Sequence, residues 1–121
     1  MKVLIVDDEE LVATLVESFI KHLFDAETVV CHNAEETIVA LNDNGKFDKV
    51  LTDWNMPGGN GNLVIEAAKN AGIAVEDIVV MTGKVDENQE AAASLGVTAI
   101  LEKPFTGGLA SSLKEAFFQT A

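Results

Sequence analysis

Five short apolar runs, each followed by a stretch with helical periodicity, constrain the fold of this 121-residue chain more than any other feature. The runs cover Val3–Val6, Glu27–Cys31, Asp48–Thr52, Ile78–Met81 and Thr98–Leu101. Short apolar runs are typical of strands that are buried on both faces of a parallel sheet. Because short connections join each strand to a helix, the pattern predicts one α/β domain, a doubly wound (βα)5 sandwich with helices on both faces of a five-stranded parallel sheet.

The stretches between these runs carry helix signals. In the first stretch, apolar residues recur at every fourth position with further apolar residues beside them, which predicts a helix with one wide apolar face. This face consists of Leu11, Leu15, Phe19 and Leu23, with Val12, Val16 and Ile20. Asn33 stands three residues before Glu36, a capping-box pattern that predicts a second helix ending near Gly45. Further helices are expected over 62–70, from 86 to about 95 and from about 109 to 118.

The charge balance excludes some classes of partner. The chain has 20 acidic residues against 8 lysines, no arginine and a formal net charge of −12. Direct binding to nucleic acid or to an anionic membrane relies on basic patches, so neither is expected. The composition favours basic protein partners or metal cations.

The compartment is expected to be the cytoplasm. Cys31 is the only cysteine, so no internal disulfide can form, and it is interpreted as a small strand residue. The apolar run Val3–Val6 is too short for the core of a signal peptide, and no later run approaches the length of a membrane span. We therefore expect a cytoplasmic protein without membrane insertion.

Polar side chains follow four of the five predicted strands. Asp7 and Asp8 follow the first, Asp53 the third, Thr82 the fourth and Lys103 the fifth. Each has an ordinary interpretation alone: acids at a helix N-terminus, an Asx turn, a simple turn and a surface lysine. Because the carboxyl ends of parallel strands meet at one edge of a sheet, however, all of them are expected to lie close together.

These residue types complement one another chemically. Crowded carboxylates repel, which raises their pKa values unless a cation is present. Mg²⁺ takes hard oxygen ligands, and it is usually held by one or two carboxylates together with waters and phosphate oxygens. A lysine ammonium and a threonine hydroxyl are donors for phosphate oxygens. The combination therefore indicates a Mg²⁺-dependent phosphoryl site with Asp53 as the nucleophile.

The same residues resemble a known family over the whole chain, residues 1–121. The family is the receiver domain of two-component response regulators, and the resemblance is closest to the single-domain chemotaxis (CheY-like) type. It rests on Asp7-Asp8, Asp53-Trp54-Asn55-Met56-Pro57, Gly61, Met81-Thr82-Gly83 and Lys103-Pro104-Phe105-Thr106. The resemblance implies a flavodoxin-like sheet with the strand order 2-1-3-4-5.

The resemblance also implies roles for the acidic residues. Asp53 would accept a phosphoryl group from the phosphohistidine of a histidine kinase. Asp8, Asp53 and the backbone carbonyl of Asn55 would ligate Mg²⁺, while Asp7 would act mainly through a metal-bound water. We expect Trp54 to pack, partly exposed, beside the acceptor.

The resemblance further implies roles for residues of the switch and beside it. Lys103 would pair with the phosphoryl oxygens or, before phosphorylation, with Asp53. Thr82 would move toward the phosphate and hydrogen-bond to it. The position three before Lys103 is usually aromatic in chemotaxis-type receivers, and its ring rotates as the threonine moves; here it is Ile100, so an aromatic readout is excluded. Lys84, two residues after Thr82, stands at a position that tunes phosphoryl hydrolysis in this family.

The predicted function is a phosphorylation-activated switch that changes affinity for a protein partner, such as the flagellar motor or another output. It is not an enzyme with an external product, although it catalyses its own phosphorylation and dephosphorylation. Three alternatives stay open: a receiver cut from a larger regulator with a DNA-binding or enzymatic output domain, an aspartyl-nucleophile phosphatase, and a flavodoxin relative or inert docking module. Asn55 disfavours the phosphatase, because such enzymes carry a second aspartate two residues after the nucleophile.

Overall fold

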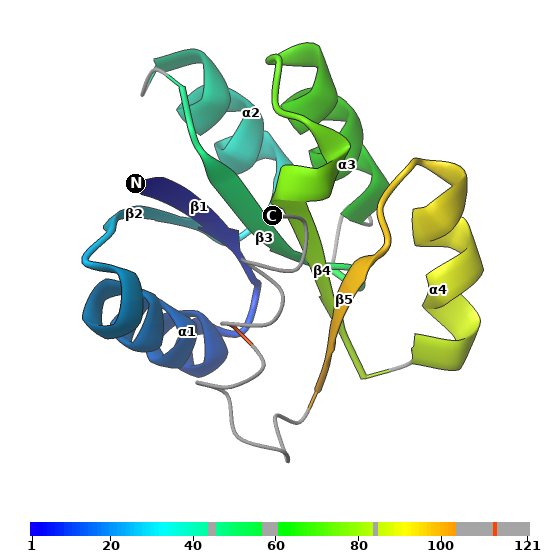
Figure 1. The fold of residues 1–121 in the computed structure, drawn as a ribbon, viewed down its shortest axis with the longest axis horizontal. Helices are drawn as coiled ribbons and strands as arrows, with labels where there is room; N and C mark the ends of the chain where they lie inside the picture. The colour runs from blue at the N-terminus through cyan, green and yellow to red at the C-terminus, as the bar shows by residue number, and fades with distance from the viewer. Residues whose placement is uncertain (44–45, 57–60, 84, 104–112, 114–121) are drawn as a thin grey trace.

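The computed structural model describes residues 1–43, 46–56, 61–83, 85–103 and 113 (Figure 1). Within these residues, one sheet of parallel strands has the order β2-β1-β3-β4-β5. Its strands are β1 (Lys2–Val6), β2 (Glu27–Cys31), β3 (Lys49–Asp53), β4 (Ile78–Thr82) and β5 (Ala99–Glu102). The predicted α/β class and the implied strand order are both confirmed.

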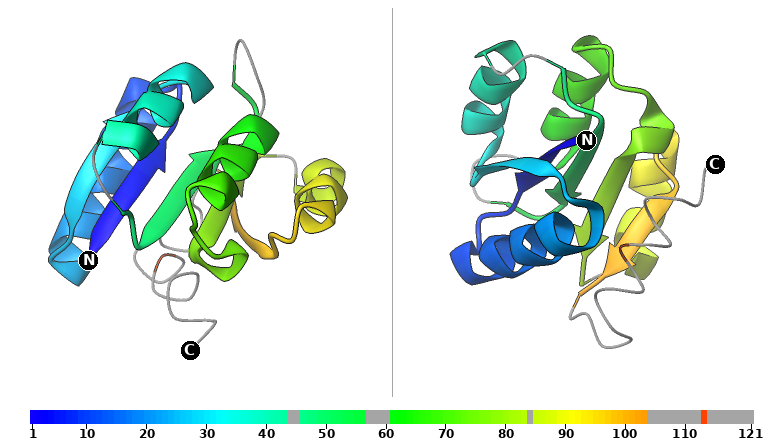
Figure 2. Two further views of the ribbon diagram at one scale, coloured as in Figure 1. Left: turned by 90° about the horizontal axis from the view of Figure 1, so that it is seen from above. Right: turned by 60° about the vertical axis from the view of Figure 1, so that its left-hand side comes forward.

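The helices divide between the two faces of the sheet. They are α1 (Glu10–Phe24), α2 (Ala34–Asp43), α3 (Gly61–Asn70) and α4 (Val85–Ser94), with a short 3-10 helix, η1 (Val75–Asp77), before β4. Figures 1 and 2 show α1 on the opposite side of the strands from α2 and α3. In the described part of the chain, no helix is both long and apolar enough to cross a membrane.

Alternation along the strands creates two apolar cores, one on each face. The core under α1 is built from Val3, Ile5, Leu51, Val79 and Met81 with Val16 and Ile20 of α1 and Leu113. The core on the other face is built from Leu4, Val6, Val50, Ile78 and Val80 with Leu41 of α2, Val64, Ile65 and Ala68 of α3, and Ala92 of α4. The sheet is therefore covered on both faces, as the unbroken apolar runs predicted.

The predicted element boundaries are close to those observed. Asp53 and Thr82 are the last residues of β3 and β4, where the sequence placed them just after the strands. The cap of α2 is confirmed, since the Glu36 N–H donates to Asn33 Oδ1 at 2.8 Å. The predicted last helix, from about 109 to 118, lies outside the described residues except at Leu113, as does Lys84.

The predicted apolar face of α1 is confirmed where Val12, Phe19 and Leu23 pack against the core around Val16 and Ile20, but it is wrong at its start, Leu11 and Leu15. Leu11 is 87% exposed and Leu15 is 47% exposed, whereas Val16 and Ile20 are fully buried. A helix turns about 100° per residue, so each step of four residues drifts about 40° around the axis. The start of the stripe therefore points away from the sheet, and Leu11 lies on the side opposite Ile20.

This difference predicts unequal effects of two substitutions on the same helix. Ile20→Ala should lower the free energy of unfolding by about 2–5 kcal/mol, because it empties space in a closed core. Leu11→Ala should change it by less than about 0.5 kcal/mol, because its side chain is already in water. Urea denaturation of both variants checks this, and equal losses would contradict the assignment of the buried face.

Candidate functional site

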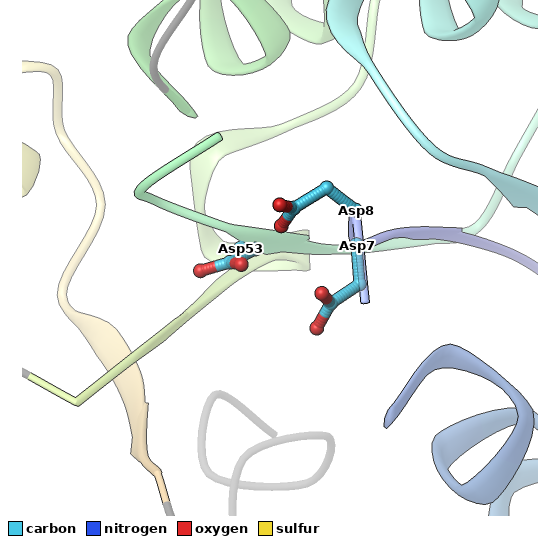
Figure 3. Close-up of side chains that lie close together, drawn as sticks. All are labelled: Asp7, Asp8 and Asp53. Atoms are coloured by element: carbon cyan, nitrogen blue, oxygen red, sulfur yellow. The ribbon is translucent and has the colours of Figure 1, made fainter. Parts of the chain in front are cut away.

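Three carboxylates gather at the carboxyl edge of the sheet, as predicted. Asp7 and Asp8 follow β1, Asp53 ends the neighbouring strand β3, and one oxygen of each lies within 4.8 Å of the others (Figure 3). Asp7 is fully buried and Asp53 is 5% exposed, whereas Asp8 is exposed to solvent. The cluster therefore has two fixed inner carboxylates and one that faces the solvent.

Backbone contacts fix Asp7 at the centre of this edge. Its Oδ1 accepts a hydrogen bond from the Glu9 N–H at 2.9 Å, and its own N–H donates to the Cys31 carbonyl at 3.0 Å. The Asp7 carbonyl lies 3.0 Å from His32 Nδ1, which must carry the hydrogen because a carbonyl oxygen only accepts. Both β2 and the start of α1 therefore hold this carboxylate in place.

The Lys103 ammonium joins the two inner carboxylates. Its Nζ lies 2.7 Å from Asp7 Oδ2 and 3.2 Å from Asp53 Oδ2, and a weaker contact of 3.8 Å reaches Glu9. Burial alone would lower the pKa of Lys103, but the hydrogen bond to Asp7 and the charges of Asp53 and Asp7 outweigh it, so the pKa is raised. The predicted pairing of Lys103 with Asp53 is confirmed, and the shorter contact is to Asp7.

The Asp53 carboxyl has an unusual pKa. Its pKa is raised from 3.8 to about 6 as the net result of burial, which raises it, the charge of Lys103, which lowers it, and the charge of Asp7, which raises it. A hydrogen bond from the backbone N–H of Asn55 also favours the carboxylate. The cost of burying a second carboxylate beside Asp7 is therefore only partly offset by the lysine.

Thr82 lies on the strand next to Asp53 and is fully buried. Its carbonyl accepts a hydrogen bond from the Lys103 N–H at 2.8 Å. Its hydroxyl accepts another from the side-chain amide of Asn88, in α4, also at 2.8 Å. Ile100 of β5 is half-buried and packs against the core on the α2–α4 face. The predicted switch pair thus occupies neighbouring strands, β4 and β5.

The prediction that Trp54 is partly exposed is wrong. The side chain is 7% exposed and belongs to the core on the α2–α4 face. Its N–H donates to the Met81 carbonyl at 3.1 Å, and its carbonyl accepts from the Gly61 N–H at 2.7 Å. A Cβ on Gly61 would stand 2.9 Å from the Asp53 carbonyl oxygen and 3.0 Å from Trp54 Cα. Glycine therefore lets α3 close tightly over the acceptor strand.

The donor set suits a magnesium ion. Carboxylate oxygens are hard ligands, and three of them at one edge repel one another unless a cation intervenes. Asp8 offers an exposed carboxylate, and Lys103 leaves Asp7 and Asp53 with further acceptor capacity. The residues present therefore fit Mg²⁺.

The comparisons with known proteins agree with this geometry. Residues 3–113 match the family model of the response regulator receiver domain. The chain belongs to this family. Receivers carry an acidic Mg²⁺ site, and the carboxylates of Asp7, Asp8 and Asp53 form such a cluster here.

Chemotaxis proteins are among the similar receivers. The chain is 35% identical to chemotaxis protein CheY-3 of Vibrio cholerae, over 95% of this chain and 87% of that protein. It is 28% identical to chemotaxis protein CheY of Pseudomonas aeruginosa, over 98% of this chain and 97% of that protein. A crystal structure of Vibrio cholerae CheY4 superposes with a TM-score of 0.85 at 22% identity, covering 99% of this chain and 98% of that one. At that identity, the structural match supports the fold alone.

Sequence reasoning missed three residues that contact the site. Glu9 approaches Lys103, His32 lies against the Asp7 carbonyl, and Asn88 contacts Thr82. Glu9 directly follows Asp7-Asp8, and His32 directly follows β2, the strand that pairs with β1, so their position along the chain was an available signal. Asn88 stands four residues before the buried Ala92, and an amide on the inner face of a helix was the signal there.

Replacing Asp53 should stabilise the metal-free receiver at neutral pH. A carboxyl whose pKa rises from 3.8 to about 6 on folding is protonated in both states only well below pH 3.8, and stability is lost as the pH rises from there through about 6. Asp53→Asn should therefore raise the free energy of unfolding by about 1–3 kcal/mol at pH 7.5. The gain should shrink as the pH falls from 6 toward 4.

Urea denaturation in EDTA measures this difference. Glu66→Gln, which removes an exposed acid of α3, is the matched control and should leave stability nearly unchanged. A gain that is equally large at about pH 3 would contradict the assigned cause, because Asp53 is then largely protonated in both states.

Mg²⁺ should change the fluorescence of Trp54, which is the only tryptophan of the chain and adjoins Asp53. The apparent affinity of the receiver for Mg²⁺ should weaken as the pH falls through about 6, because a protonated Asp53 is a poor ligand. Fluorescence titration of the wild type and Asp53→Asn checks both effects, with Glu66→Gln as the control. An equal affinity in the wild type and Asp53→Asn would exclude Asp53 as a ligand.

Proposed function

We propose that this receiver accepts a phosphoryl group on Asp53 from the phosphohistidine of a histidine kinase, and that the modification switches its affinity for a protein partner. The observation that carries the proposal is the shared environment of Asp53. Its carboxylate lies beside two further carboxylates and contacts the Lys103 ammonium at 3.2 Å. A nucleophile, a cation site and a positive side chain are thus combined at one edge.

Magnesium would be held mainly by Asp8 and Asp53 with the backbone carbonyl of Asn55, and Asp7 would hold a metal-bound water. When bound, the ion neutralises the charge of the transferring phosphoryl group. The exposed Asp8 leaves this side of the site accessible to the ion and to the donor. Lys103 would keep its contact with Asp7 and pair with a phosphoryl oxygen.

The reaction would transfer one phosphoryl group from the imidazole of the kinase histidine to Asp53. A carboxylate oxygen of Asp53 forms a bond to phosphorus, the phosphorus–nitrogen bond of the donor breaks, and its electron pair returns to the imidazole. The product is an acyl phosphate on Asp53. Attack by water on its phosphorus releases inorganic phosphate and restores the carboxylate. The receiver therefore supplies the chemistry for its own phosphorylation and dephosphorylation without an external product.

The response begins with Thr82 and Lys103. Phosphorylation adds negative charge, to which a hydroxyl and an ammonium are the complementary donors. Lys103 N–H and the Thr82 carbonyl are hydrogen-bonded at 2.8 Å, so the ends of β4 and β5 should respond together. Ile100 would move with them as part of the switch, without an aromatic ring. The population would shift between two arrangements of these units.

The downstream partner is expected to be a protein rather than nucleic acid. A net charge of −12 favours a basic surface on that partner. A role in chemotaxis, with the flagellar motor or another output as target, is suggested by the CheY relatives. A histidine-kinase donor also fits a cytoplasmic location. The 121 residues are proposed to act as one receiver domain, and an attached output domain is an alternative that the full reading frame would decide.

Intact-mass measurement tests the proposal. With Mg²⁺ and acetyl phosphate, the wild type should gain one phosphoryl group, and no gain is expected for Asp53→Asn or in EDTA. Glu66→Gln should behave like the wild type. A wild type that gains no phosphoryl group from acetyl phosphate or a phosphorylated histidine kinase would refute the acceptor role.

A further inference from the structure

The inner face of α4 carries a polar side chain where a helix against a sheet is normally apolar. Asn88 is 8% exposed, and Ala92, one turn later on the same face, is fully buried. Burying an amide is unfavourable unless its polar atoms find hydrogen-bond partners. The position of Asn88 therefore depends on the group that it contacts.

That group is the hydroxyl of Thr82. Asn88 Nδ2 donates to Thr82 Oγ1 at 2.8 Å, and both side chains are buried. The Thr82 carbonyl is held from the other side by the Lys103 N–H. The residue proposed to respond to the phosphoryl group is thus tied to α4 through its side chain and to the end of β5 through its backbone.

We propose that Asn88 is a positioning residue that holds the Thr82 hydroxyl in the unphosphorylated arrangement and transmits its movement to α4. This inference rests on the proposed phosphorylation of Asp53. When Thr82 Oγ1 turns toward the phosphoryl oxygens, its bond to the Asn88 amide must break or draw α4 along. In either case the free-energy cost of moving Thr82 depends on the position of α4.

The packing around β5 gives this bond a particular importance. Ile100 packs against the core that contains Ala92, on the same face as α4. A branched aliphatic side chain offers no hydrogen-bonding group and no flat ring to signal the position of Thr82. The Asn88 amide, by contrast, contacts the Thr82 hydroxyl directly and belongs to α4, so it can carry a movement of Thr82 to that helix.

The test compares rates of Asp53 phosphorylation by acetyl phosphate with Mg²⁺, measured by intact mass. Asn88→Ala removes one hydrogen bond to the Thr82 hydroxyl and should increase the rate roughly threefold to tenfold, the effect of losing one hydrogen bond. Asn88→Leu, which fills the space better, should act in the same direction and covers the case in which Asn88→Ala does not fold. Asn88→Asp should slow the reaction, because its carboxylate accepts the single hydroxyl hydrogen of Thr82.

The Thr82→Val background separates positioning from a general structural effect. Without the hydroxyl, Asn88→Ala should leave the rate within twofold of Thr82→Val alone. Gln89→Ala, an exposed change on the same helix, is the matched control and should leave the wild-type rate unchanged. In the wild type, the side-chain amide signal of Asn88 in a nitrogen-15 NMR spectrum should also shift on phosphorylation.

The outcomes distinguish this inference from the proposed function. If the wild type takes up no phosphoryl group, both fall together. If the wild type is phosphorylated but Asn88→Ala and Asn88→Leu keep its rate, only the role of Asn88 is overturned. An increase that persists with Thr82→Val, or a faster Asn88→Asp, would also overturn it, because the effect would then not pass through the hydroxyl.

Discussion

The repulsion between carboxylates at one edge of the sheet is the constraint on which this receiver depends. A parallel sheet delivers the ends of β1 and β3 to the same place, and each end carries an acid. Lys103 offsets part of the repulsion through contacts with Asp7 and Asp53. The remainder leaves Asp53 with a raised pKa. Negative charge at this edge of the sheet is thus only partly neutralised, at the place where a metal ion and a phosphoryl donor would bind.

The sequence predicted most of the fold and the composition of the site for a simple physical reason. Buried strands need continuous apolar runs, which mark the strands in the sequence. Because parallel strands align their carboxyl ends, the proximity of Asp53 and Lys103 could be predicted from their positions at the ends of these runs. Tertiary packing decided the rest. Leu11 turned out exposed because helical drift carried it away from the sheet, and Trp54 turned out buried because α3 closes over it. The partner of the Thr82 hydroxyl depends on how α4 docks, which local patterns do not specify.

The two faces of the sheet make different contacts with the elements around the site. The core under α1 joins residues of β1, β3 and β4 to the buried face of α1, and β1 lies between β2 and β3. On the other face, α3 begins at Gly61, whose backbone lies against the backbone of Asp53 and Trp54 more closely than a larger residue would allow. Polar contacts with Thr82 enter from this second face through Asn88. The face against α4 therefore contains the side-chain contact through which a change at Thr82 can reach a helix.

The pairing of Asp7 with Lys103 joins residues 96 positions apart in the chain. A growing polypeptide carries its first acids early in synthesis, but it lacks their counter-charge until β5 has been made and added to the sheet. The site is therefore assembled last, by the same step that completes the sheet's edge. A chain interrupted before this strand would keep both inner carboxylates but lack the ammonium that contacts them. The counter-charge of the two inner acids therefore depends on the fifth strand of the sheet as well as on the strands that carry the acids.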